Sequence, residues 1–401
     1  MRTADAVTSG VPGRVHLLAA GAFAVGTSAY VVAGVLPGIS EALGVSTAAA
    51  GQLTTAFALA YAIGAPVLAT VLGRMERRSL LVAALVVGAL GNLLSALAPG
   101  YAVLMLGRVL AALGAAAFTP GATHVATMLT PESSRGRAVA AVFTGITLSL
   151  VVGVPAGTLL GGVIGFRGVF VVIAGICLLA AVGVRVLLPP VPAPPPVRLR
   201  ERVAVAADPA VLTVLGIVVF GLLAVLTVYT YIAPFLAASA GITGVALSVL
   251  LALYGTGALV GNDLGGRLTD RFGTRRPLLW ALPVITVALV TLPLTAVSAA
   301  GAGIALFVLG AGFVVNSPVQ TRLIELAPAS SALVLSLNAS AIYLGIGLAG
   351  AVGGLVVNTA GVLALPFVGA AISVGSLALL ALAWRQEPRR AAPPPDGTVG
   401  P

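Results

Sequence analysis

An arginine and an aspartate fall well inside long apolar runs of this sequence, where charge is costly. Arg108 lies in LMLGRVLAALGAAA and Asp263 lies in GTGALVGNDLGG, whereas the other acidic residues fall in expected loops or tails. A charge inside hydrocarbon must pair, line a wet cavity or move protons, and burial favours the neutral form of a carboxyl. We therefore predict that Asp263 titrates and that Arg108 is the accompanying cation. The alternatives are a structural aspartate, bonded to a neighbouring helix or reaching water, and an arginine that clamps backbone carbonyls.

A second charged cluster, GGRLTDRFGTRR at 265–276, separates two apolar runs. Glycines allow helices to approach closely, and a carboxylate in such a loop can face the positive N-terminus of a neighbouring helix. Arginines there stay at the cytoplasmic membrane surface. The pattern predicts a cytoplasmic gate made by Gly266, Asp270, Arg271, Gly273, Arg275 and Arg276.

The elements that must position these residues are apolar helices. Hydrophobic residues make up 59% of the 401 residues, charged residues make up 8%, and the mean hydropathy is +1.13. The apolar runs are continuous rather than alternating and about 20 residues long, which predicts helices that cross a bilayer. We therefore expect an all-α integral membrane protein with twelve transmembrane helices. The predicted spans are 17–39, 50–72, 80–98, 101–123, 138–162, 168–188, 211–236, 245–267, 277–297, 300–321, 332–357 and 362–384.

The 21 basic residues are all arginines, and they fall mainly in alternate loops. Only Arg167 lies in the loops on the other side, so the positive-inside rule places both termini in the cytoplasm of a plasma (inner) membrane protein. The absence of lysine excludes a Walker A loop and a Schiff base, and His16 and His124 have no second histidine or cysteine nearby that would complete a zinc site. We expect no enzymatic activity, no cofactor, no metal and no nucleic-acid partner.

The chain also repeats itself. The pair Gly114 and Pro120 recurs 198 positions later as Gly312 and Pro318, and similar loops, TPESS and APASS, follow. A proline-rich joint between the repeats cannot span a membrane and predicts an extended linker. Two repeats of one orientation are typical of a transporter that rocks about a central site. The expected parts are a six-helix half at 1–188, a cytoplasmic linker at 189–210, a six-helix half at 211–386 and a disordered cytoplasmic tail at 387–401.

These motifs resemble the major facilitator superfamily, and within it the twelve-span drug:proton antiporter branch of arabinose-efflux and chloramphenicol-resistance type permeases. The 265–276 run is similar to the family's loop between spans eight and nine. Its first-half copy, LGRMERR, has Gly73 in place of the family's aspartate and Glu76 in place of a glycine, and we expect Gly73 to accept an aspartate. Arg108 is similar to the family's span-four arginine, but Ala29 replaces its span-one glutamate. The resemblance implies the major facilitator fold, with two halves related by pseudo-two-fold symmetry, without the usual coupling carboxylate.

Span five, GITLSLVVGVPAGTLLGG, resembles the family's antiporter motif, which goes with export. Its proline bends the helix that closes the site, and its glycines permit close packing. The alternative is that these glycines serve helix packing alone. The motif positions are Gly145, Gly153, Pro155 and Gly157.

Together, the resemblance and the charge pattern predict a secondary active transporter that exports small drug-like or metabolite-like molecules by alternating access and proton antiport. An importer or facilitator without proton antiport is the main alternative, favoured by Ala29 and by the altered first-half loop. A non-transporting membrane sensor is a remote alternative. We expect a monomer whose partners are its small-molecule substrate, protons and the lipid bilayer. The predicted cavity residues are Tyr30, Thr119, Tyr229, Asn316, Gln320 and Asn338.

Overall fold

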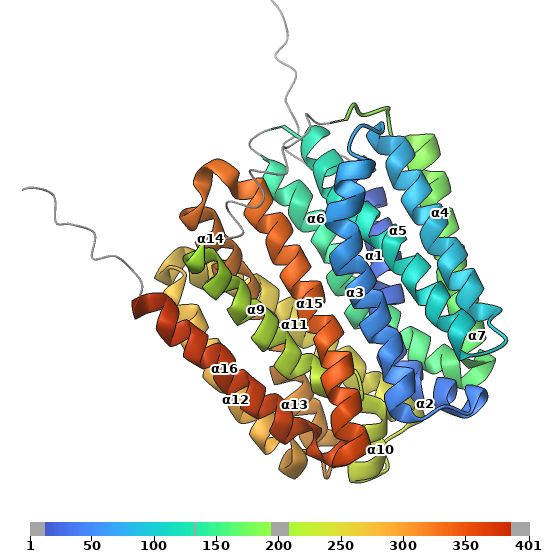
Figure 1. Cartoon of the computed structure of the whole chain (residues 1–401), viewed down its shortest axis with the longest axis vertical. Coiled ribbons are helices and arrows are strands. Elements are labelled where there is room, and N and C mark those ends of the chain that lie inside the picture. The colour runs from blue at the N-terminus through green and yellow to red at the C-terminus, as the bar shows by residue number, and fades with distance from the viewer. Residues whose placement is uncertain (1–12, 132–133, 194–207, 386–401) are drawn as a thin grey trace, which may run out of the picture.

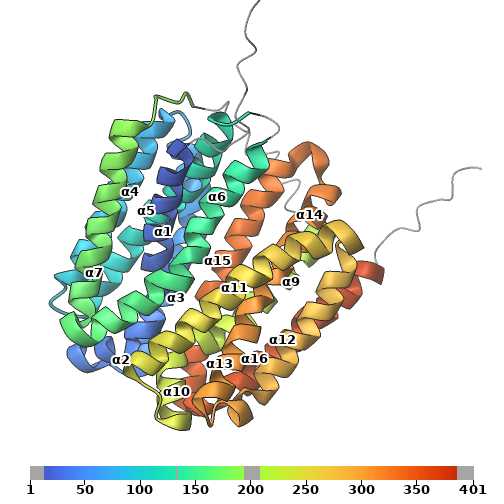
Figure 2. The same cartoon turned by 180° about the vertical axis from the view of Figure 1, so that it is seen from behind.

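The computed structural model describes residues 13–131, 134–193 and 208–385, and within these ranges the chain forms helices and no strands. Most of the predicted linker and all of the predicted tail lie outside the described residues. Figures 1 and 2 show two helical bundles side by side, one from each half of the sequence. The predicted all-α fold is confirmed.

The first bundle follows the apolar runs of spans one to six. Polar residues at the run boundaries begin its helices, since the Ser46 hydroxyl accepts a hydrogen bond from the Ala49 N–H at 3.1 Å and so caps the second span. The elements are α1 (Gly13–Tyr30), α2 (Val32–Leu43), α3 (Thr47–Val71), α4 (Arg77–Ala96), α5 (Tyr101–Met128), α6 (Arg135–Leu148), a π-helical turn η2 (Ser149–Gly153) and α7 (Val154–Leu187).

The second bundle is built in the same way. Asp208 caps its first helix by accepting a hydrogen bond from the Ala210 N–H at 2.8 Å. The elements are α9 (Pro209–Tyr229), α10 (Ile232–Ala240), α11 (Gly244–Phe272), α12 (Arg275–Thr295), α13 (Ala299–Ala311), the 3-10 turn η3 (Gly312–Val315), α14 (Asn316–Leu326), the 3-10 turn η4 (Pro328–Ser330), α15 (Ser331–Thr359), the 3-10 turn η5 (Val362–Ala364) and α16 (Leu365–Arg385).

The helices account for the twelve predicted crossings. Ten helical stretches in the described residues are long and apolar enough to cross a membrane, and the pair α1 and α2, bent by 46°, makes an eleventh. One of the ten, Arg135–Leu187, has 53 residues; at full helical length it would reach about 80 Å, more than twice the hydrocarbon core. It reverses at Gly165, whose φ of 68° is left-handed, and Gly157 then packs against Val169. This stretch therefore supplies two crossings.

Several spans are interrupted near their middle. The first span of each bundle breaks at an equivalent point, after Tyr30 in the first bundle and after Tyr229 in the second. Span five contains the π-helical turn η2, and span ten contains the 3-10 turn η3. Spans four and ten are equivalent in the sequence repeat but differ in structure. In span four, α5 stays helical through Pro120, whereas in span ten the turn η3 divides the helix before Pro318. Such irregular turns often mark functional positions.

Small residues bring α4 and α5 into close contact. A side chain at Gly91 would collide with the backbone of Ala111, and one at Gly114 would collide with the backbone of Gly88. In lipid, helices associate through such close packing because there is no hydrophobic force between them. This contact fixes α5, which carries Arg108, inside the first bundle.

Candidate functional site

The contacts between the two bundles lie toward one end of the molecule. We call the end with the α3–α4, α5–α6 and α11–α12 loops the arginine-rich face, and the opposite end, with α2 and α10, the arginine-poor face (Figure 1). Toward the arginine-poor face, Gln52 Nε2 and Tyr231 Oη donate hydrogen bonds to the Gly350 carbonyl at 3.1 and 2.8 Å. Gly255 of α11 packs there against the backbone of Leu150. The bundles are closed on this side.

Toward the arginine-rich face the same helix surfaces are exposed. On α3, Pro66 and Ala69 continue the surface that packs on α15, and both are exposed. On α11, Leu259 and Asn262 continue the surface of Gly255 and are exposed too. Because residues three or four apart share a helix face, the bundles separate toward this end. The space between them therefore opens at the arginine-rich face.

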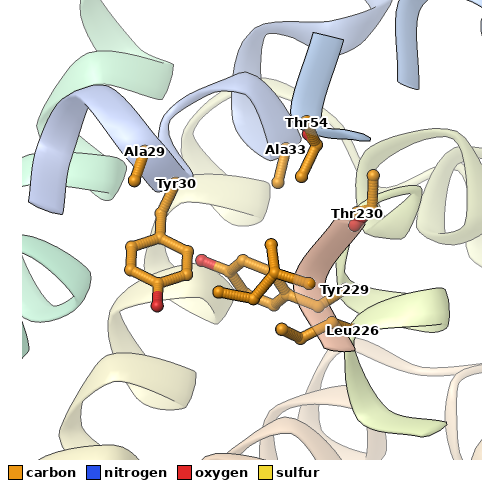
Figure 3. Close-up of a pocket in the computed structure, with 8 residues that line it drawn as sticks. Ala29, Tyr30, Ala33, Thr54, Leu226, Tyr229 and Thr230 are labelled. Atoms are coloured by element: carbon orange, nitrogen blue, oxygen red, sulfur yellow. The ribbon is translucent and has the colours of Figure 1, made fainter. Parts of the chain in front are cut away.

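A pocket lies between the bundles at the two broken spans. Ala29 and Tyr30 line it from the end of α1, and Tyr229 and Thr230 line it from the end of α9. Figure 3 shows the Tyr229 ring extending from the second bundle toward Tyr30 of the first. The other lining residues are Ala33, Thr54, Leu226 and Ile346. The equivalent breaks of the two bundles thus meet at one site.

Five tyrosines from five helices gather around this pocket, and we call them the tyrosine cluster. The rings of Tyr61 and Tyr343 stack with their centroids 3.4 Å apart, and those of Tyr229 and Tyr254 pack at 4.3 Å. Tyr30 lies near both pairs. The Tyr229 hydroxyl is buried and has no hydrogen-bond partner among the described residues, so it is available to a ligand.

Arg108 lies next to this site, inside the first bundle, and is fully buried. Its Nη2 donates to the Ser28 carbonyl at 2.7 Å and its Nη1 to the Ser28 hydroxyl at 3.2 Å. That hydroxyl donates in turn to Asn92 Oδ1 at 2.9 Å, and the guanidinium lies 4.5 Å from the Phe57 ring centroid. Arg108 forms no ion pair with any described carboxylate. The carbonyl contact is the one that the clamp alternative predicts.

The predicted burial of Asp263 is wrong. Its side chain is 58% exposed and forms an ion pair with Arg267, one turn later, at 2.8 Å. The reason is the orientation of α11, which packs its glycine stripe, Gly257, Gly261 and Gly265, onto the backbone of α13 and η3. Asp263 projects from another side of the helix. No carboxyl group in the described part of the chain is buried.

The predicted gate residues lie at the arginine-rich face. Helix α11 ends at Phe272, and Gly273, with a φ of 73°, makes the turn into α12. Asp270 and Arg271 are exposed, and Arg271 lies 5.1 Å from the Phe272 ring centroid. A side chain at Gly266 would meet no atom within 4 Å. The remaining gate residues, Arg275 and Arg276, are also exposed.

The first-half copy of this loop is folded against the start of the linker. The Glu76 carboxylate accepts hydrogen bonds from the Val191 and Ser79 N–H groups, each at 2.8 Å, and the Arg77 N–H donates to the Val191 carbonyl at 2.9 Å. Partial burial raises the pKa of Glu76, but the Val191 hydrogen bond and those within the loop outweigh it and lower that pKa to about 2. Glu76 also caps α4.

The expectation that Gly73 accepts an aspartate is wrong. A Cβ at this position would lie 2.7 Å from the Ala69 carbonyl oxygen. The Gly73 carbonyl also accepts a hydrogen bond from Arg77 Nη2 at 2.7 Å. The loop is therefore too tight for a side chain here.

The antiporter-motif residues pack on α1. A side chain at Gly145 would collide with the Ala19 backbone, and one at Gly153 would collide with Thr27. Gly157 faces Val31, the residue at the α1 break, so that span five follows α1 from its middle to the pocket. The fourth motif residue, Pro155, is the second residue of α7, which begins directly after η2.

The predicted cavity residues are divided between different places. Tyr30 and Tyr229 line the pocket. Thr119 faces the Tyr61 hydroxyl of the tyrosine cluster, although its Oγ1 forms no well-aligned hydrogen bond. Asn316 lines a separate pocket inside the second bundle. The Asn338 side chain is buried, with its Oδ1 unpartnered among the described residues, and Gln320 is half-buried.

Sequence reasoning missed three members of the tyrosine cluster, Tyr61, Tyr254 and Tyr343. A signal was available, because the whole chain has only seven tyrosines. A scarce residue with both an aromatic ring and a hydroxyl in the middle of an alanine- and glycine-rich span is an unusual choice for simple packing.

Two bundles of six crossings that meet at a central pocket, closed at one face and open at the other, define a membrane transporter that works by alternating access. The chain belongs to the Major Facilitator Superfamily, whose family model matches residues 18–332. It is therefore a multi-pass membrane protein.

Its similarity to individual proteins extends over most of the sequence. It is 38% identical over 375 residues to the inner membrane transport protein YdhP of Escherichia coli K12, covering 92% of this chain and 96% of that protein. It is 36% identical over 267 residues to a chloramphenicol resistance protein of Streptomyces lividans, covering 65% and 68%. In fold it is similar to a bacterial homolog of the human lysosomal transporter Spinster in an inward-facing, occupied conformation, with a TM-score of 0.74, 21% identity, and coverage of 92% and 96%.

Proposed function

We propose that this transporter exports small amphipathic molecules from the cytoplasm in exchange for protons. The observation that carries the proposal is the packing of the antiporter-motif helix on α1, where Gly153 contacts Thr27 and Gly157 contacts Val31. These contacts flank Ala29 and Tyr30 of the pocket, so a movement of span five changes the site. Similarity to a protein named for chloramphenicol resistance supports outward transport, since a pump confers resistance by removing the drug.

In this proposal the arginine-rich face is cytoplasmic, because arginines concentrate on the cytoplasmic side of membrane proteins. The test uses single cysteines in a Cys177→Ser background. An impermeant thiol reagent added to intact cells should label Glu41→Cys, on the exposed part of α2 at the arginine-poor face, and should not label Gly136→Cys, on the exposed start of α6. The reverse labelling pattern would refute the orientation.

The proton-coupling residues in this proposal remain Arg108 and Asp263. Arg108 is the stronger candidate, because its charge is fully buried without a described carboxylate partner. Proteoliposomes with an imposed pH gradient should accumulate chloramphenicol or a metabolite-like probe against its gradient. Arg108→Ala should abolish this dependence. Asp263→Asn should keep substrate binding and lose the dependence only if its carboxyl takes part; unchanged uphill transport would remove Asp263 from the mechanism.

An importer or facilitator is the second candidate, and the specific observation that favours it is the absence of a buried carboxyl among the described residues. The same proteoliposomes distinguish the two functions. Equal transport with and without a pH gradient, in both directions, would establish a facilitator and refute antiport.

A further inference from the structure

The closed face between the two bundles is held by side-chain hydrogen bonds as well as by helix packing. Helix α3 of the first bundle and α15 of the second lie side by side there (Figure 1). The Gln52 side chain of α3 crosses to α15 and donates a hydrogen bond to the Gly350 carbonyl at 3.1 Å. The Tyr231 hydroxyl of the second bundle donates to the same carbonyl at 2.8 Å. One backbone oxygen thus receives a donor from each bundle.

Tyr231 occupies a slot to which both bundles contribute. Its side chain is fully buried. A Cβ at Gly51 of α3 would collide with the tyrosine ring and hydroxyl, and a Cβ at Gly353 of α15 would lie 2.6 Å from its Cε2. The hydroxyl also donates a longer hydrogen bond, at 3.4 Å, to the Ala48 carbonyl of α3. The ring therefore fills the space between the two helices, and a separation of α3 from α15 uncovers it.

The break in the first span of the second bundle places Tyr231 in this slot. The residue directly precedes α10 and belongs to neither α9 nor α10. The equivalent residue of the first bundle, Val31, directly precedes α2 and packs on Gly157 of its own bundle. At equivalent breaks, therefore, the first bundle has a small residue that packs within the bundle, and the second has a large residue that reaches the opposite bundle.

From this arrangement we infer that Gln52 and Tyr231 form a latch that holds the arginine-poor face closed. Gln52 is the donor that crosses between the bundles, and its hydrogen bond to Gly350 breaks each time this face opens in the transport cycle. Tyr231 is the positioning residue, because its ring fills the slot and its hydroxyl binds the same carbonyl. A side chain at Gly354 would collide with both Gln52 Nε2 and the Tyr231 hydroxyl. The inference goes beyond the direction of transport, since an exporter and an importer must both open this face.

The test measures the distance across the arginine-poor face in the full chain in lipid nanodiscs, without substrate or gradient. In a Cys177→Ser background, spin labels at Leu97→Cys and Val297→Cys mark the two bundles, because both residues are exposed in loops at this face. Double electron–electron resonance gives the fraction of molecules in which the labels are far apart. Gln52→Leu removes the donor that crosses between the bundles and should raise this fraction about fivefold. Tyr231→Phe should raise it about twofold, because the shorter hydrogen bond of its hydroxyl lies within the second bundle.

Tyr101→Phe is the matched control. The Tyr101 hydroxyl also donates to a carbonyl of α3, that of Ala49 at 2.6 Å, but both residues belong to the first bundle. Its loss should lower thermal stability and leave the distances unchanged, as a purely structural role of the latch residues would. A wild-type distance distribution in the Gln52→Leu, Tyr231→Phe double variant, or an equal shift in Tyr101→Phe, would overturn the inference. A failure of export or of proton coupling would leave the expected distances unchanged, because the measurement involves neither.

Discussion

The α3–α4 loop of the first bundle is tied to the start of the linker, whereas the α11–α12 loop of the second bundle lies exposed at the arginine-rich face. In the first, the Glu76 carboxylate binds the Val191 N–H. In the second, the acidic residue of the motif is Asp270, which aligns with Gly73 of the first loop, and it is exposed. The two loops are copies of one sequence motif, but they make different contacts. The first loop anchors the start of the linker through Val191, whereas Asp270 and Arg271 of the second loop are exposed.

The interiors of the two bundles also differ, both in their buried charge and in the continuity of their helices. At the repeat distance of 198 residues, the buried Arg108 of span four corresponds to the buried Leu306 of span ten. Span five carries the π-helical turn η2 before Pro155, whereas the equivalent α15 is one continuous helix. The first bundle thus contains the buried charge and the bent helix. We infer that the chemistry of the transport cycle is concentrated there, and that the second bundle supplies the movable gate.

The largest expected effect comes from Gly157→Leu in the first bundle. A leucine cannot fit between span five and Val31, so folding or transport should be abolished. Gly162→Leu is the matched control in the same helix, because a side chain there meets no atom within 4 Å. Expression and efflux would be measured for both variants. Normal efflux by Gly157→Leu would mean that the span-five contact is dispensable.

The second expected effect concerns the exposed loop of the second bundle. Asp270→Asn and Arg271→Ala should each slow transport by about tenfold without unfolding the protein, since both side chains are exposed in this arrangement. Transport rates and thermal unfolding would be compared for each variant. If both variants transport at the normal rate, the α11–α12 loop is not a gate.

The third expected effect is a difference in stability between variants at Glu76, which binds the start of the linker, and at Asp270, the predicted gate residue. Glu76→Ala removes the α4 cap and the linker contact, and should lower the free energy of unfolding by about 1 to 2 kcal/mol. Asp270→Ala, in the other copy, should change it by less than about 0.5 kcal/mol, because surface residues contribute little. Thermal unfolding in detergent would measure both. Equal destabilisation by the two substitutions would mean that the copies have the same structural role.

The hydrogen bonds of the Glu76 carboxylate also predict that the stability of the protein depends on pH. The pKa of Glu76 is lowered from 4.5 to about 2 in the folded protein. A group with a lowered folded pKa stabilises the fold fully above its unfolded pKa, and this contribution is lost as the pH falls from about 4.5 toward 2. Glu76→Gln should flatten that part of the stability profile. A wild-type profile with the same slope as the variant would contradict the anchor.

The smallest expected effect is that of Gly73→Asp, which would restore the family's acidic residue in the first loop. The new Cβ would approach the Ala69 carbonyl, so we expect a destabilisation of about 1 kcal/mol and no gain in transport. Gly136→Asp, where no atom lies within 4 Å, is the control for an added charge at this face. Faster transport by Gly73→Asp would show that the first loop can still act as a gate.

Much of the fold could be predicted from local composition. The apolar runs predicted the crossings because a backbone in lipid must satisfy its hydrogen bonds within a helix. The repeat predicted two halves, and helix periodicity predicted Tyr30 and Tyr229 as cavity residues, which line the pocket. The exposure of Asp263 could not be predicted, because both its own side of α11 and the glycine stripe fit a packed helix face.

By itself, therefore, the sequence determined the number and order of the crossings, the two-bundle repeat and the clustering of arginines in alternate loops, because each follows from the order of residue types along the chain and not from which helices meet. Only the tertiary structure decided which faces of these helices meet. It brought five tyrosines from five helices to one pocket and turned Asp263 outward beside Arg267. The reason is that each residue rotates a helix face by about 100°, so that packing against distant segments, rather than local sequence, selects the face that is buried.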